Sequence, residues 1–124
     1  MSREDKKFVV QKHTHQGSVH WDFMLEKQDF LQTYRLDKSP EQILQKPAKA
    51  EQIFDHSLKF LTYQGPVNQG RGSVSIVESG TYQVGKESHN LIELQLTGQI
   101  LKGKFILQHF AENNWCLFME TLCL

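Results

Sequence analysis

The chain has 124 residues, 39% of them hydrophobic, and its 14 basic side chains balance its 14 acidic ones. This length and composition predict one globular domain over residues 1–124, and the zero formal charge counts against a protein that coats nucleic acid through an overall basic field. No apolar run approaches the length of a membrane span and residues 1–7 are too polar for a signal peptide, so we expect a cytoplasmic protein with no membrane partner.

The first two predicted strands enclose the densest group of chemically versatile side chains. Residues 8–13 and 19–26 are rich in β-branched and aromatic residues, which is typical of strands. At the two-residue period of a strand, His20 and Asp22 share one face of the second strand, opposite an apolar face. If the two strands pair as a hairpin, His13 at the end of the first strand lies beside them.

Two imidazoles and a carboxylate suit a borderline divalent ion such as Zn²⁺, Mn²⁺ or Fe²⁺. The alternative is three independently hydrated groups, because the polar face of a strand usually meets solvent. In a barrel this face can instead line the interior cup, where a metal and a phosphate would be partly dehydrated. We take His13, His20 and Asp22 as the candidate metal ligands, with His15 as the alternative to His13.

A third strand over residues 30–36 is followed by the one helix that the sequence indicates. Ser39 is a suitable N-cap, Pro40 occupies the first helical position, and Gln42 stands at the capping-box position. We expect this short helix to end at about Gln45.

Beyond residue 50 the pattern predicts short strands separated by turns. Residues 74–77 alternate as a strand, and residues 78–80 are expected to turn. The segment 65–72 is either a plain glycine turn or a backbone cradle for phosphate, with Arg71 as a charge donor. About eight strands and one helix at this spacing indicate a mainly β protein, and we expect an antiparallel β-barrel.

Several motifs follow one another in the order found in a known family. FVVQKH at residues 8–13 and HWDFMLE at residues 20–26 resemble FVxQKH and LHYDFRLE, the signature of the 3′-phosphoesterase domain of bacterial DNA ligase D. Weaker collinear elements are DHSL at 55–58, a glycine-rich segment at 65–74, SGTY at 79–82, LKGKF at 101–105 and Trp115. The resemblance spans nearly the whole chain and is that of a divergent, stand-alone member.

The resemblance implies that His13, His20 and Asp22 hold a catalytic divalent ion, of which Mn²⁺ is the first expectation. It implies that His56 contacts the scissile phosphate or transfers a proton. The expected activity is hydrolysis at 3′ ends of DNA during repair, with removal of a 3′-phosphate or a terminal ribonucleoside. The expected partners are a nucleic-acid 3′ end and a separate ligase or repair protein in trans.

Two positions depart from the family pattern. Met24 stands in place of an arginine and Phe60 in place of a tyrosine, and both family residues serve the substrate phosphate. Loss of a guanidinium and a hydroxyl implies weakened, redirected or absent activity, although Arg71 is a candidate replacement. Two alternatives therefore stay open: a catalytically inactive module that binds nucleic-acid ends or a repair partner, and a metalloenzyme that acts on a small phosphoester.

Overall fold

The computed structural model describes residues 5–120. These residues form nine strands, one short α-helix and two 3₁₀ helices. In chain order they are β1 (Lys6–His15), β2 (Ser18–Glu26), β3 (Leu31–Leu36), α1 (Pro40–Ile43), β4 (Ala48–His56), η1 (Leu58–Leu61), β5 (Gly65–Val67), η2 (Asn68–Gly70), β6 (Gly72–Ser88), β7 (Leu91–Gly98), β8 (Lys102–Ala111) and β9 (Asn114–Met119).

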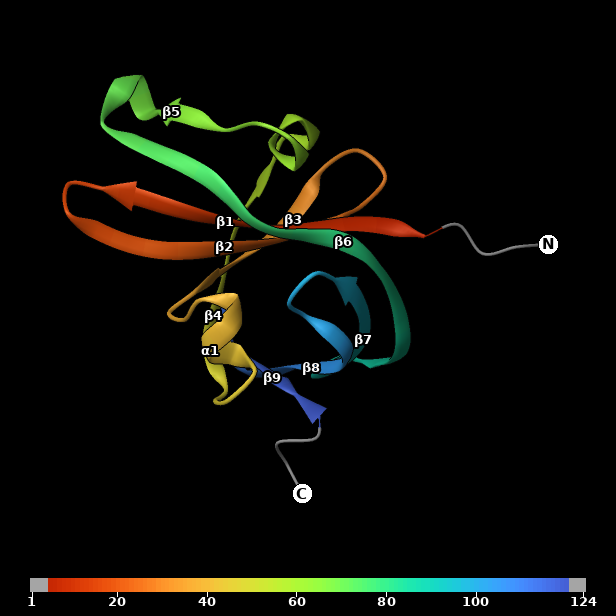
Figure 1. Ribbon diagram of the computed structural model, residues 1–124. Helices are drawn as coiled ribbons and strands as arrows, with labels where there is room; N and C mark the ends of the chain where they lie inside the picture. The colour runs from red at the N-terminus through yellow and green to blue at the C-terminus, as the bar shows by residue number, and fades with distance from the viewer. Residues whose placement is uncertain (1–4, 121–124) are drawn as a thin grey trace.

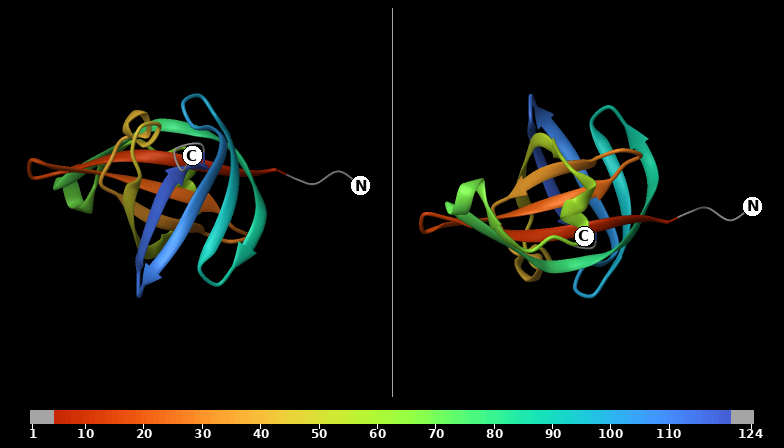
Figure 2. Two further views of the ribbon diagram at one scale, coloured as in Figure 1. Left: turned by 90° about the horizontal axis from the view of Figure 1, so that it is seen from below. Right: turned by 90° about the horizontal axis from the view of Figure 1, so that it is seen from above.

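The strands form a closed antiparallel barrel (Figures 1 and 2). The sheet order is β1-β2-β3-β4-β9-β8-β7-β6-β5, and β1 also pairs with β6, so eight strands close and β5 is added beside β6. The predicted barrel of about eight strands is confirmed. No helix among the described residues has the length and apolarity needed to cross a membrane.

The barrel interior is filled by one face of each strand. On β2 this face carries Phe23 and Leu25, which pack with Tyr34 and Leu36 of β3 and with Phe105 of β8. All five side chains are at most 2% exposed. Because side chains alternate along a strand, His20 and Asp22 point away from this interior.

The chain between β4 and β6 covers part of the barrel's outer face. In Figure 1, β5 and the nearby 3₁₀ turn lie across β1 and β2 from the strands β7–β9. Buried Gln11 fixes this cover, because its amide nitrogen donates to the carbonyl oxygens of Phe60 and Tyr63, each at 2.9 Å. A small apolar cluster of Val9, Met24 and Leu31 packs beneath η1.

Helix α1 begins as the sequence predicts. The Ser39 hydroxyl accepts from the backbone N–H of Gln42 at 3.3 Å, and the Gln42 side chain accepts from the Ser39 N–H at 2.8 Å, which completes a capping box. The helix ends at Ile43, slightly before the expected position. Within the expected loop at 65–72, the chain forms β5 and η2 instead of an irregular turn.

The expected turn at residues 78–80 is wrong, because β6 runs without interruption from Gly72 to Ser88. Gly80 serves close packing instead of a turn. A Cβ atom there would lie 2.1 Å from the carbonyl oxygen of Thr97 on β7, so only glycine allows the two strands to pair this closely.

A β-bulge on β6 turns Glu78 into the barrel. The register against β1 shifts between Val10 and Gln11, so β6 carries an extra residue there. The Glu78 side chain is buried and its two carboxylate oxygens accept four backbone N–H bonds at 2.6 to 3.0 Å, from Ser79, Gln99, Ile100 and Leu101. This carboxylate therefore holds the turn between β7 and β8.

Replacing Glu78 by glutamine should destabilise the barrel. The amide nitrogen of Glu78→Gln would face N–H donors, and hydrogen bonds to a charged acceptor are worth about 1.5 to 3 kcal/mol each. We expect urea denaturation to report a loss of about 3 kcal/mol in the free energy of unfolding. Glu87→Gln, an exposed position on the same strand, is the matched control and should be neutral. Equal stability of the two variants would contradict a stabilising role for the hydrogen bonds that the Glu78 carboxylate accepts.

Candidate metal centre

A tight hairpin brings His13 and His20 together. The turn between β1 and β2 has two central residues, Gln16 and Gly17, with φ of 50° and 83°. Positive φ at both positions is the type I′ geometry that matches the twist of paired strands. The resulting register places His13 directly opposite His20, and Asp22 follows two residues later on the same face.

The three predicted ligands converge on the outer face of the barrel. His13 Nδ1 lies 3.0 Å from His20 Nε2, His20 Nε2 lies 3.3 Å from Asp22 Oδ1, and His13 Nδ1 lies 3.9 Å from Asp22 Oδ2. Their donor atoms all lie within 4.8 Å of one another. Two ligands each about 2.1 Å from one ion lie about 3.0 to 3.4 Å apart, so the spacing fits a shared cation. His15 is not part of this group, although its ring lies 6.4 Å from that of His13.

Asp22 carries an unpartnered oxygen that such a cation would satisfy. Its side chain is only 5% exposed, and Oδ1 accepts no hydrogen bond from any described residue despite lying near His20. A buried carboxylate oxygen without a partner is costly. The donor set of two imidazole nitrogens and one carboxylate is one that Zn²⁺, Mn²⁺ or Fe²⁺ accepts.

The surroundings of His13 favour the neutral form that a metal ligand requires. Burial lowers the pKa of His13 below its ordinary 6.5, and neighbouring His20 and Arg35 lower it further, against the opposing effect of Asp22. Its ring packs over Gly72 of β6, where a Cβ atom would come within 3.1 Å of Nε2. Glycine at the start of β6 therefore makes room for the His13 ring.

His56 has a defined hydrogen-bond pattern at the end of β4. The Thr33 hydroxyl donates to the Leu31 carbonyl at 3.1 Å, so it accepts the proton of His56 Nδ1 at 2.9 Å. The Phe54 carbonyl lies 3.2 Å from the same nitrogen. With Nδ1 protonated, Nε2 of the neutral ring is left as the acceptor.

His56 and two of the three grouped side chains line one cleft of about 180 Å³ between the sheet and its cover. The cleft is lined by Gln11, His13, Asp22, Arg35, Ile53, Phe54, His56, Phe60, Val67, Asn68 and Val74. His20 lies at its edge through its contacts with His13 and Asp22. The site is thus on the outside of the barrel, not in the interior cup considered from the sequence, because the inward face is already filled by apolar side chains.

The structure does not bring Arg71 into this cleft. Arg71 follows η2 and is exposed, whereas Arg35 lines the cleft from β3. Arg35 lies opposite Asp22 in the β2–β3 register, and no acidic side chain among the described residues forms an ion pair with it. Sequence reasoning missed Arg35; the period-two pattern of the third strand, which puts it on the Asp22 face, was the available signal.

The two departures from the family pattern lie in one apolar patch. Met24 is fully buried beneath η1, and Phe60 packs against the same cluster. Phe60 also meets the ring of His56 edge to face, with centroids 5.6 Å apart. Phe60 is therefore an apolar neighbour of His56 at the position where the family pattern has a hydroxyl, and Met24 fills a buried apolar position where the pattern has a charge.

The fold and the site define a class: a small closed β-barrel that carries a candidate divalent-metal centre on its outer face, beside a histidine-lined cleft. A model of the DNA Ligase D 3′-phosphoesterase domain matches residues 11–109. The chain belongs to this family.

Similar proteins come from mycobacteria. The chain is 27% identical over 123 residues to the multifunctional non-homologous end joining protein LigD of Mycolicibacterium smegmatis, covering 88% of the chain and 16% of that protein. It is 29% identical over 115 residues to the corresponding proteins of Mycobacterium bovis and Mycobacterium tuberculosis, covering 87% of the chain and 15% of each. The chain thus spans about one sixth of the length of these relatives.

The depressed pKa of His13 predicts a pH-dependent stability of the metal-free protein. The unfolded chain binds a proton at His13 more readily than the folded one, so stability from this group is present above pH 6.5 and is lost as the pH falls below it. We expect the Tm in EDTA to fall between about pH 7 and pH 5, and His13→Asn to flatten that fall. His89→Asn, at an exposed position, should keep the wild-type slope. If the Tm of His13→Asn depends on pH as steeply as that of the wild type, the lowered pKa of His13 is not the cause of the fall in stability.

Proposed function

We propose that this domain is a metal-dependent phosphoesterase that processes 3′ ends of DNA in repair, by removing a 3′-phosphate or a terminal ribonucleoside. The observation that carries the proposal is the convergence of three ligand atoms within 4.8 Å beside the cleft that holds His56. Membership of the 3′-phosphoesterase family supports the substrate class. A cytoplasmic location and a separate ligase or repair partner in trans are parts of the same proposal.

His13, His20 and Asp22 would hold the ion, and Mn²⁺ is our first choice, with Zn²⁺ as the alternative. When bound, such an ion polarises a phosphate oxygen and lowers the pKa of a water molecule. The protein supplies the neutral His13 ring, the buried Asp22 carboxylate and a cover that limits the entry of water. A low local dielectric strengthens the attraction between these groups and a phosphate.

His56 would donate or accept a proton at the scissile bond through Nε2. Thr33 and the Phe54 carbonyl orient the ring through Nδ1, and the exposed ring of Phe54 stacks on it at 4.9 Å between centroids. A histidine side chain can carry a proton to a leaving oxygen or stabilise charge on the transferred group. Oriented in this way, the neutral ring of His56 accepts a proton through Nε2, and the imidazolium that forms can donate it to the leaving oxygen.

Arg35 would supply the guanidinium that the Met24 position lacks. Its charge acts on His13, which places it close to the candidate ligands, and no carboxylate among the described residues neutralises it by an ion pair. An arginine fork can bind two phosphate oxygens at once. We therefore assign phosphate binding to Arg35 together with His56, in preference to Arg71.

The proposal is tested by release of phosphate from a primer that ends in a 3′-phosphate, in the presence of Mn²⁺. We expect turnover by the wild type, none by His20→Ala, and a fall in kcat of about 100-fold or more in His56→Ala, because general acid–base catalysis contributes about 10² to 10⁴. His109→Ala, which alters a histidine outside the cleft, is the control and should be as active as the wild type.

Two results would replace the proposal. Binding of the primer end without turnover would indicate a non-catalytic end-binding module, which the apolar Met24 and Phe60 would explain. Turnover of small phosphoesters alone would indicate a different substrate. Undiminished activity of His20→Ala would exclude the metal site as the catalytic centre.

Removing the Arg35 guanidinium should weaken substrate binding. Hydrogen bonds to charged groups contribute about 1.5 to 3 kcal/mol, so Arg35→Met should raise the KM for the primer at least about tenfold. Arg35→Lys should recover part of the loss, because it keeps the charge and loses the fork. The matched control is Arg71→Met. A larger effect of Arg71→Met than of Arg35→Met would return the phosphate-binding role to Arg71.

A further inference from the structure

An exposed aromatic ring lies at the rim of the candidate site. Among residues 5–120, Phe54 is the most exposed large apolar side chain, at 73%. It lines the same cleft as His56 and as two members of the ligand group, which consists of His13, His20 and Asp22. An apolar surface beside a polar cleft is available to the apolar part of a ligand that binds there.

A β-bulge on β4 places Phe54 beside His56. The register between β3 and β4 shifts between Leu31 and Thr33, so β4 carries one extra residue and bends there. The Phe54 ring lies nearly parallel to the ring of His56, with 14° between their planes and 4.9 Å between their centroids. One face of the Phe54 ring therefore covers His56, and the high exposure of this side chain leaves the other face open.

The cleft is too small for a whole nucleotide. Its volume of about 180 Å³ is below the range of about 300 to 1,000 Å³ that is usual for small-molecule sites. A phosphate held between His56 and the ligand group leaves room for little more than the attached sugar. The base of the same nucleotide therefore lies at the rim, where Phe54 is exposed.

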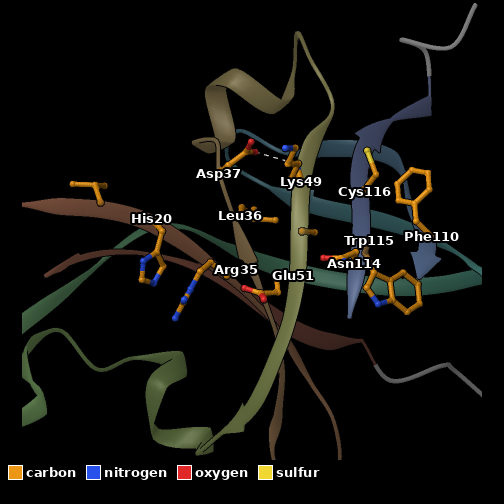
Figure 3. A pocket seen from close by; sticks show the side chains of 12 residues that line it. His20, Arg35, Leu36, Asp37, Lys49, Glu51, Phe110, Asn114, Trp115 and Cys116 are labelled. Carbon is orange, nitrogen blue, oxygen red and sulfur yellow. Dashed lines mark hydrogen bonds between the residues drawn. The ribbon is translucent and has the colours of Figure 1, made fainter. Parts of the chain in front are cut away.

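The Phe54 ring is within reach of that base. A single sugar joins a base to its 3′-phosphate, and Phe54 lies against His56 itself. Phe110, the other strongly exposed ring, lies too far away. It borders a second groove of about 670 Å³, which extends from His20 and Arg35 across β4 (Figure 3). In the sheet order β8 is four strands from β2, and neighbouring strands are about 4.8 Å apart.

The charges around Phe54 favour an uncharged group. Residues 50–58 contain Glu51 and Asp55 but no lysine or arginine. Lys59, the next basic residue, lies over the ring of Phe60, with its Nζ atom 5.3 Å from the ring centroid. A backbone phosphate gains little at this rim, whereas a base is flat and uncharged. Stacking on an aromatic ring accepts every base, because each base has a π face.

We propose that Phe54 is the stacking platform for the base of the terminal nucleoside, the one that carries the 3′-phosphate. The proposal rests on the proposed function, which places the phosphate between His56 and the ligand group. An internal base of a strand has a neighbouring base on each face, whereas the last base has one on a single face. The Phe54 ring covers the face that is left open, so this contact favours the end of a strand over its interior.

The test measures binding of single-stranded DNA, labelled with a fluorophore at its 5′ end, by anisotropy in the presence of Mn²⁺. The strand ends in a 3′-methylenephosphonate, in which a CH₂ group replaces the bridging oxygen, so the terminal group cannot be hydrolysed. Two oligonucleotides are compared, one with a normal terminal nucleoside and one whose terminal sugar lacks a base. We expect the wild type to bind the first about tenfold more tightly, which is the contribution of one stacked base.

Three variants test the role of the ring. Phe54→Ala should bind the normal oligonucleotide about tenfold more weakly than the wild type does, and the oligonucleotide without the base within about twofold. Phe54→Trp keeps a flat ring and should retain the preference for the base. Phe110→Ala removes a ring of similar exposure, 66%, and as the matched control it should bind both oligonucleotides as the wild type does. Thermal melting of each variant checks the fold.

Equal binding of the two oligonucleotides by the wild type would overturn the proposal. An equal loss of affinity for both in Phe54→Ala would also overturn it, because the ring would then act only by holding His56 in place. The same holds if sedimentation shows that Phe54→Ala dissociates an oligomer, since a second copy would then cover the ring. Absence of phosphate release from the 3′-phosphate primer by the wild type would refute the proposed function and leave this binding result standing.

Discussion

The site depends on the register between β1 and β2. In this register His13 lies opposite His20, and the two-residue turn at Gln16 and Gly17 fixes it. A slip of one residue would move every side chain of one strand to the opposite face. The apolar side chains on the inner face of β2 would then lie outside, so burial of the core and assembly of the ligand group are enforced by the same alignment.

The protein has two layers of side chains with different roles, an apolar barrel core and an outer layer beside the candidate site. The inner faces of the strands form the hydrophobic core, and a separate outer layer from η1 to η2 forms the cleft above His13 and Asp22. Gln11 links the layers through two hydrogen bonds to the carbonyls of Phe60 and Tyr63. The candidate site therefore lies at a covered outer surface, where side chains need not fill a closed barrel.

Local patterns predicted much of this arrangement, and long-range contacts determined the rest. The alternation of β2 and the capping box at Ser39 are local signals, and both were read correctly. The turn expected at Glu78–Gly80 was wrong. The glycine at position 80 is needed for close packing against the neighbouring strand β7, and the residues near it in the sequence do not show this contact. Arg35 was missed for a related reason: its place beside Asp22 follows from strand pairing, and the cover that makes a cleft there is distant in sequence.

The separation of the two layers has a consequence for how such a domain diverges. Met24 and Phe60 belong to the small cluster beneath the cover, and the barrel core shares none of that cluster's three fully buried members. A substitution in this cluster therefore changes the packing beneath the cover, and it leaves the side chains of the main core in place. The cluster beneath the cover and the packing of the barrel core can thus change independently of each other.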